Sequence, residues 1–262
     1  MEAFSYTATV LFVVACILHV AGLILLTKVK PKPDNQRMIL MNLAVVEILY
    51  AFSLIIYTTQ RSTAESWQMT FDFSWISIFA VFQLLMLYIV TDKTATIYLH
   101  MRYPVIFTRQ KVRVILVLFW IFGASIGMVA TLVQIFTSIE RTQVIMVWTY
   151  SYLAMDILII FVFVSQFTYF FRKVKYIQRC NNKTLANVVN KPFVRTVPRF
   201  MLPGVIVGTY VLFCLTSTIL RLLNFDRIAT FLECACMISD ALTYILFKKH
   251  IRKYLRNIIH SS

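Results

Sequence analysis

Long apolar stretches, separated by short polar or basic segments, dominate the pattern of the chain. A helix needs about 20 apolar residues to cross the hydrocarbon core of a bilayer, whereas a strand of a membrane barrel needs only about 9–11. The stretches have the helical length, so the pattern predicts an all-α membrane protein. We expect seven transmembrane helices, at about 5–27, 38–59, 71–93, 114–136, 144–171, 200–223 and 227–247.

The last part of the chain shows a different periodicity. In "FKKHIRKYLRNII" the apolar residues share one helical face and the basic residues fill the other. This pattern predicts an amphipathic helix at 248–259 that lies on the anionic inner surface of the membrane. A disordered basic tail is the alternative.

Composition and charge narrow the class and the orientation. The chain is 60% hydrophobic and 14% charged, with a mean hydropathy of +0.76, which excludes an ordinary soluble domain. Of the 26 basic residues, all but Arg61, Arg141, Arg221 and Arg227 fall in the connections expected on one side. The positive-inside rule therefore predicts one multi-pass domain over 1–262, with the N-terminus outside and the C-terminus inside, rather than a nucleic-acid-binding protein. We expect the first apolar stretch to remain as a span, since it is too long for a signal peptide.

Several ionisable residues lie inside the predicted spans, where they are costly and therefore candidates for function. Glu47 and Asp240 are expected to face the bundle axis at similar depth and to share water, a proton or a cation. Asp156, Glu233 and His19 are also intramembrane. A purely structural hydrogen-bond network is the alternative interpretation.

Asp92 and Lys93 are adjacent at the inner end of the third predicted span. An acid and a base at this boundary can pair in one helix arrangement and separate in another, as a conformational switch requires. The alternative is that Lys93 simply extends toward the membrane surface.

Five degenerate motifs occur in order along the spans. They are Asn42 to Glu47 in "NLAVVE", Asp92 and Lys93 in "TDKTATIY", Trp120 in the fourth span, Tyr169 in the fifth, and Asp240 to Tyr244 in "DALTY". Together they make the chain resemble the rhodopsin-like (class A) G-protein-coupled receptors over essentially its whole length. The wording of "NQRMILMNLAVVE", "YLHMRYP" and "SDALTYIL" is similar to uncharacterised receptors of cnidarians.

The resemblance implies a receptor in the plasma membrane that passes ligand binding to a heterotrimeric G protein. By position, the coupling switch would comprise Asp92, Lys93, Tyr169 and Tyr244. The intramembrane polar core would comprise Asn42, Glu47 and Asp240. The allosteric logic would be a population shift between two bundle packings.

Departures from the family pattern bear on these roles. Lys93 replaces an arginine and lacks its planar, two-pronged donor geometry. The sixth span reads "YVLFCLTST" and has neither the tryptophan nor the mid-span proline of the family. The disulfide that would tie the third span to the second outer loop cannot form. Phe82 stands where the family supplies a serine to sodium, so a shared proton between Glu47 and Asp240 is favoured over a metal ion.

The resemblance also bears on the ligand. Trp75 occupies the position at which amine receptors carry an aspartate, and Cys234 the position of the opsins' retinal-binding lysine. A salt bridge to an amine at Trp75 and a retinal Schiff base are therefore excluded on this alignment. An aromatic pocket for a small molecule or short peptide remains. Its predicted lining is Tyr57, Trp75, Phe79, Asp156 and Glu233.

Two other classes of function remain open on the sequence, and a third, an enzyme, is not expected. A proton- or ion-coupled transporter could use Glu47, Asp156 and Asp240 as its path, although the chain lacks the internal repeats and broken spans of such proteins. A seven-span scaffold or decoy that no longer signals is a second alternative. An enzyme is not expected, because no nucleophile–base pair or metal-ligand spacing stands out, and no cofactor is predicted.

Overall fold

The computed structural model describes residues 2–28, 35–59, 65–99, 102–137, 139–179, 197–223 and 225–247. Within these ranges every regular element is helical. The elements are α1 (Glu2–Lys28), α2 (Asn35–Thr59), α3 (Glu65–Leu99), α4 (Tyr103–Ile106), α5 (Arg109–Phe136), α6 (Arg141–Arg179), α8 (Val197–Tyr210), the π-helix η2 (Val211–Leu215), α9 (Thr216–Leu222) and α10 (Asp226–Phe247). The prediction of an all-α chain is confirmed.

Six helical segments of the described residues are long and apolar enough to cross a membrane. They lie in α1, α2, α3, α5, α6 and the continuous α8–η2–α9 unit. The chain is therefore a multi-pass membrane protein. Helix α10, where the sequence predicts a seventh span, is not among the six, and it carries the buried acids Glu233 and Asp240.

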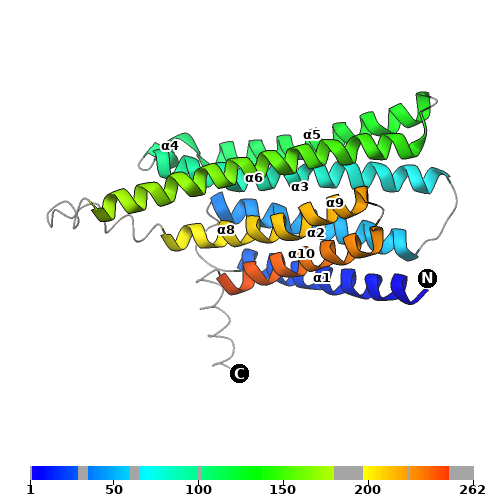
Figure 1. Cartoon of the computed structure of the whole chain (residues 1–262), viewed down its shortest axis with the longest axis horizontal. Coiled ribbons are helices and arrows are strands. Elements are labelled where there is room, and N and C mark those ends of the chain that lie inside the picture. Colours follow the sequence, from blue (N-terminus) through cyan, green and yellow to red (C-terminus); the bar gives the residue numbers. More distant parts are fainter. Residues whose placement is uncertain are drawn as a thin grey trace, which may run out of the picture.

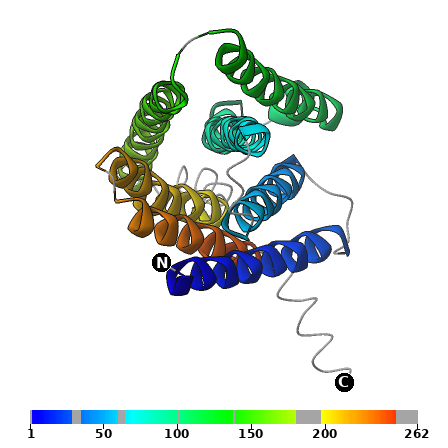
Figure 2. The same ribbon diagram turned by 90° about the vertical axis from the view of Figure 1, so that its right-hand side faces the viewer.

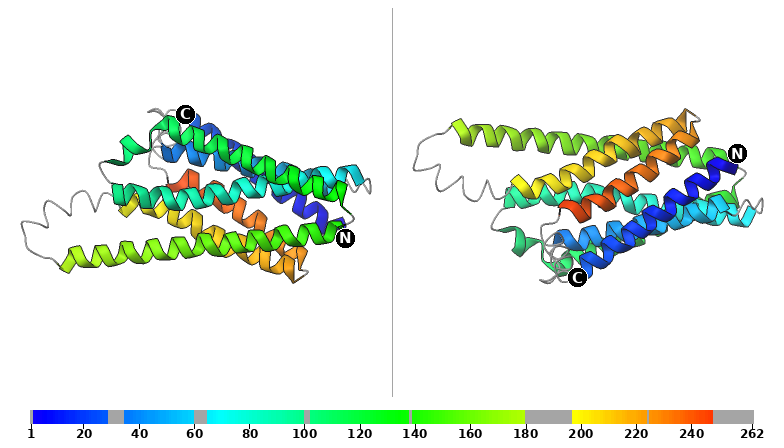
Figure 3. Two further views of the ribbon diagram at one scale, coloured as in Figure 1. Left: turned by 90° about the horizontal axis from the view of Figure 1, so that it is seen from above. Right: turned by 90° about the horizontal axis from the view of Figure 1, so that it is seen from below.

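The helices run side by side along one long axis (Figures 1 and 3). Viewed from the end at which α1 begins, α3 lies near the middle of the bundle (Figure 2). Helices α5 and α6 lie to one side of it, and α1 and α10 to the other. Within its apolar stretch, 61% of α3 is buried, against 22% for α5 and α6. Helix α3 is thus the element that most of the others pack around.

Helix α5 begins at a defined cap and then packs closely on α3. The Thr108 side chain accepts a hydrogen bond from the Lys111 backbone N–H, which satisfies one of the open donors at this end. Further along, a Cβ atom at Gly127 would lie 2.0 Å from the Ser77 hydroxyl oxygen, and one at Gly123 would lie 2.8 Å from the Ser77 carbonyl oxygen. Only glycine lets the two backbones approach this closely, as in the small-residue seams of other membrane helices.

The region predicted as the sixth span changes its helical register at a point where no proline stands. The α-helical turns of α8 widen into the π-helix η2 and return to α-helix at Thr216. Short π-helical turns inside α-helices occur often at functional sites. The predicted interfacial helix at 248–259 and the centre of the long basic connection, 180–196, lie outside the residues that the structure describes.

Candidate functional site

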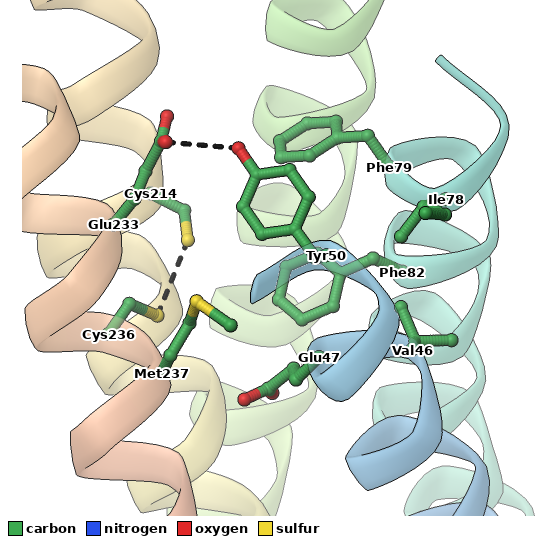
Figure 4. Close-up of a pocket in the computed structure, with 10 residues that line it drawn as sticks. All are labelled: Val46, Glu47, Tyr50, Ile78, Phe79, Phe82, Cys214, Glu233, Cys236 and Met237. Carbon is green, nitrogen blue, oxygen red and sulfur yellow. Dashed lines mark hydrogen bonds between the residues drawn. The ribbon is translucent and has the colours of Figure 1, made fainter. Parts of the chain in front are cut away.

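Two polar clusters lie between the helices, and each contributes one carboxyl side chain, Glu47 or Glu233, to the lining of a small cavity (Figure 4). The first, which we call the carboxyl cluster, consists of His19 on α1, Glu47 on α2 and Asp240 on α10. Their exposed fractions are 0%, 2% and 0%. Each comes from a different helix, so the cluster links three elements at one depth.

Contacts within the carboxyl cluster join its members directly. The His19 Nε2 atom contacts the Glu47 carboxylate and lies 2.8 Å from the Met237 carbonyl oxygen. The carboxyl groups of Glu47 and Asp240 lie close enough for each to influence the charge of the other, and the Thr209 hydroxyl donates to Asp240 Oδ1 at 2.8 Å. Two neighbouring buried carboxyl groups cannot both ionise cheaply, so a proton on one of them lowers the cost of their burial. The cluster therefore favours one protonated carboxyl group between two helices.

The second group, the arginine cluster, is formed by Arg221 and Ser217 on α9, Glu233 on α10 and Tyr50 on α2. Arg221 donates from Nε to Glu233 Oε1 at 2.9 Å and from Nη2 to Oε2 at 2.7 Å. Ser217 donates to Oε1 at 2.7 Å, and the Tyr50 hydroxyl donates to Oε2 at 3.0 Å. Four donors thus surround one buried carboxylate, which keeps its charge because a guanidinium faces it in two-pronged geometry.

The cavity between the clusters is narrow. It is lined by Val46, Glu47, Tyr50, Ile78, Phe79, Phe82, Cys214, Glu233, Cys236 and Met237. It leaves about 20 Å³ for the centre of a water molecule, and a single water needs about 10–15 Å³ on that measure. The cavity therefore has room for one or two molecules of the size of water, beside three sulfur-bearing side chains.

The residues of the sequence-predicted ligand pocket are only partly gathered here. Phe79 and Glu233 line the cavity, and Trp75 reaches it through its indole N–H, which donates to the Tyr50 hydroxyl at 3.3 Å. Trp75 also stacks on Phe79, with ring centroids 5.9 Å apart. The side chain of Tyr57 lies outside the part of the chain that the structure describes.

Asp156 occupies a separate position between α3, α6 and α8. It is fully buried and accepts a hydrogen bond from Gln83 at 2.8 Å and another from the Tyr210 hydroxyl. Gln83 also donates to the Tyr152 carbonyl oxygen at 2.9 Å. These donors hold the Asp156 side chain between the helices, and Asp156 is not among the residues that line the cavity, whereas Glu233 is.

At the other end of α3, Asp92 is 4% exposed and accepts a hydrogen bond from the Tyr103 hydroxyl on α4. Pro104 stands in the first turn of α4, where it costs no backbone hydrogen bond, and Tyr103 stacks on Phe107 with centroids 5.2 Å apart. Burial, together with the hydrogen bond to Asp92, raises the pKa of Tyr103 above its ordinary value. The contact that the structure shows for Asp92 is thus with a tyrosine of the following segment.

The remaining residues of the predicted switch and polar core do not gather at one place among the described residues. The side chains of Lys93 and Tyr244 lie outside the described residues, and Tyr169 is 40% exposed on α6. Asn42 accepts a hydrogen bond from the Trp120 indole at 3.1 Å, which joins α2 to α5. The predicted polar core is therefore divided: Asn42 contacts α5, whereas Glu47 and Asp240 contact each other.

A further ion pair, which sequence reasoning missed, ties the ends of three helices. Arg141 at the start of α6 donates from Nε and Nη2 to the two oxygens of Asp72 on α3, at 2.6 and 2.8 Å. Gln134 of α5 lies 3.4 Å from the same carboxylate. Asp72 is 3% exposed. The feature of the sequence that could have indicated this ion pair is Arg141 itself, one of the few basic residues predicted on the outer side.

Among the residues that the structure describes, no three His, Cys, Asp or Glu side chains gather in a way that could hold a metal ion. No protein-family model and no curated protein matches the chain.

Proposed function

We propose that the chain is a receptor of the rhodopsin-like type, with seven spans and its N-terminus outside the plasma membrane. It would convert the binding of a small molecule or short peptide into activation of a heterotrimeric G protein. The sequence motifs support the choice of family, and the contacts between helices support a conformational switch. The seventh span would be α10.

The observation that carries this proposal is the carboxyl cluster. Glu47 and Asp240 stand on helices that are not neighbours in the chain, and their carboxyl groups lie close together in a buried place. Displacing one helix would leave a buried carboxyl group without its partner, which is costly in a low-dielectric interior. A bundle of this kind has discrete packings rather than a continuum, which is the property that a receptor needs.

The inner end of α3 supplies the second element of the proposed switch. Asp92 is held by Tyr103, and the connection from α3 to α5 is therefore fixed to the α3 helix in this packing. Release of that contact would free the segment that a G protein must meet. Lys93, Tyr169 and Tyr244 keep the roles in the active packing that the family resemblance implies for them.

The ligand would enter from the end at which α1 begins. Glu233, a residue of the predicted ligand pocket, lies nearer than Asp240 to the start of α10, and therefore nearer to that end. The cavity as it stands admits only water-sized molecules. A larger ligand would have to part Glu233 from Tyr50 and Trp75. Binding would then bias the packing of α9 against α2 and α10, which is the direction of coupling that the proposal needs.

The test is basal nucleotide exchange. Purified chain in lipid nanodiscs should accelerate GDP release from Gα subunits, and Lys93→Ala should lower that acceleration at least about tenfold, within the range of allosteric couplings. Lys111→Ala, an exposed lysine on the same predicted side, is the matched control and should change little. If Lys93→Ala leaves the exchange rate as it is, the assignment of the switch is wrong.

A proton- or ion-coupled transporter is the second candidate, and the same carboxyl cluster favours it. A proton shared by two carboxyl groups beside a histidine is also a step in a proton path. In proteoliposomes, a transporter would show proton flux that Glu47→Gln abolishes, together with no effect on GDP release. A decoy that no longer signals would show neither activity.

A further inference from the structure

The cavity brings together two cysteines that belong to neither polar cluster. Cys214 lies in the π-helix η2 and Cys236 on α10, and both line the cavity. Their sulfur atoms are 3.3 Å apart, and the residues are 6% and 2% exposed. Both are free thiols (Figure 4). A disulfide bond is about 2.05 Å long, so the sulfurs need to approach by little more than 1 Å.

Cys214 lies in the widened turn of η2, and a third buried cysteine of this region offers a comparison that tests the specificity of the pairing. Cys234 is 1% exposed and stands only two residues before Cys236. On an α-helix two residues are separated by about 200° around the axis, so Cys234 points to a different face. Cys234 and Cys236 are therefore equally buried and almost adjacent in the sequence, but only Cys236 faces Cys214.

We propose that Cys214 and Cys236 form an oxidisable dithiol, a modification site at which hydrogen peroxide produces a disulfide bond between η2 and α10. The oxidant class follows from the cavity, which admits one or two water-sized molecules. Hydrogen peroxide is small and neutral enough to enter. Glutathione disulfide is too large and carries charges that the apolar walls would not solvate.

The chemistry balances in two steps. One cysteine sulfur attacks a peroxide oxygen, the O–O bond breaks, and the thiol proton ends on the departing oxygen as the first water; the attacked oxygen remains on sulfur as a sulfenic acid. The second thiol then attacks that sulfur, the S–S bond forms, the S–O bond breaks, and the second thiol proton leaves with the oxygen as another water. Two thiols are oxidised, and one peroxide is reduced to two waters.

The disulfide would fix the π-helical turn to α10, immediately beside both polar clusters. Any motion that separates α9 from α10 would then be blocked until the bond is reduced. An effect on G-protein activation would rest on the function proposed above, whereas formation of the bond can be measured on the protein alone.

The experiment treats purified full-length chain in nanodiscs with hydrogen peroxide and then blocks remaining thiols with N-ethylmaleimide. Trypsin cleaves after Arg221 and Arg227, which separates Cys214 from Cys236. We expect a peptide pair joined by a disulfide, lighter by two hydrogen atoms than the sum of its parts and released by dithiothreitol. Glutathione disulfide should give no such pair within the same time.

Matched variants decide which cysteine carries the bond. Cys234→Ala should give the cross-linked pair as readily as the unsubstituted chain, and Cys236→Ala should give none. Circular dichroism on heating identifies any variant that does not fold; in that case, fragmentation of the cross-linked pair from the unsubstituted chain locates the bonded sulfur. A bond through Cys234, or reduced Cys214 and Cys236 in folded, peroxide-treated protein, overturns the proposal.

Discussion

The carboxyl cluster and the arginine cluster lie on either side of one cavity, and they solve the same problem in different ways. Glu233 keeps its charge because Arg221, Ser217 and Tyr50 all donate to it. Glu47 instead contacts His19 and has the carboxyl group of Asp240 as its neighbour, so a shared proton would stabilise this pair of acids. A buried carboxylate can thus be stabilised by a fixed cation or by a mobile proton. Only the second arrangement can change without moving a side chain.

The largest effect should come from removing the fixed cation. Arg221→Met leaves Glu233 without its counter-charge, and we expect a loss of about 3 kcal/mol in the free energy of unfolding, at the low end for a buried pair because the Arg221 side chain is 26% exposed. Reversible unfolding in mixed micelles, followed by circular dichroism, measures it. Adding Glu233→Met should recover part of the loss, since no charge then remains buried.

Arg113→Met is the control for that measurement, because Arg113 is an exposed arginine on α5. It should change the free energy of unfolding by no more than about 0.5 kcal/mol. Equal stability of the Arg221→Met protein and the unsubstituted chain would mean that Glu233 is not held by a fixed cation, and the contrast between the clusters would disappear.

A smaller effect is expected in the carboxyl cluster. Glu47→Gln retains a donor and an acceptor opposite His19 and Asp240, and an amide in place of one acid of a proton-sharing pair removes no full charge, so the cost should stay within about 1 kcal/mol. Glu233→Gln is the paired measurement, and it should cost more because it leaves Arg221 without its carboxylate. If Glu47→Gln proves the more costly change of the two, the carboxyl cluster depends on charge rather than on a shared proton.

The smallest effect should be found at the contact that belongs to neither cluster. Tyr103→Phe keeps the ring against Phe107 but removes the hydroxyl that donates to Asp92, and should cost about 0.5 kcal/mol near pH 8. The pKa of Tyr103 is raised in the folded protein, so its contribution is fully present below the ordinary tyrosine value of about 10. It is lost as the pH rises through the raised value.

Unfolding of the two proteins at pH 8 and at pH 11 checks this sign. The gap between the unsubstituted chain and Tyr103→Phe should narrow at the higher pH. A gap that widens would show that the phenolate, not the phenol, is the form that the folded protein prefers.

The sequence allows the helices to be predicted but not most of their partners. Lipid penalises buried acids so strongly that Glu47 and Asp240 had to face an interior, and the structure places them in contact. That Arg221 would meet Glu233, or Tyr103 meet Asp92, depends on the rotation and tilt of packed helices. Periodicity gives the face of a helix and not the neighbour of that face.

Asp156 and Cys236 illustrate the same difference. The sequence predicts Asp156 in the ligand pocket, but Gln83 and Tyr210 hold it between α3, α6 and α8. Cys236 meets Cys214 in the π-helical turn, and no turn of that kind is evident in "YVLFCLTST", which has neither proline nor glycine.

The glycine seam between α3 and α5 has a mechanical consequence. With Gly123 and Gly127 set against the backbone of α3, the two helices approach too closely there to slide past each other easily, so they should move as one unit. Bending of the bundle must then occur elsewhere, and the π-helical turn η2 at Val211–Leu215, between α8 and α9, is the natural place for it.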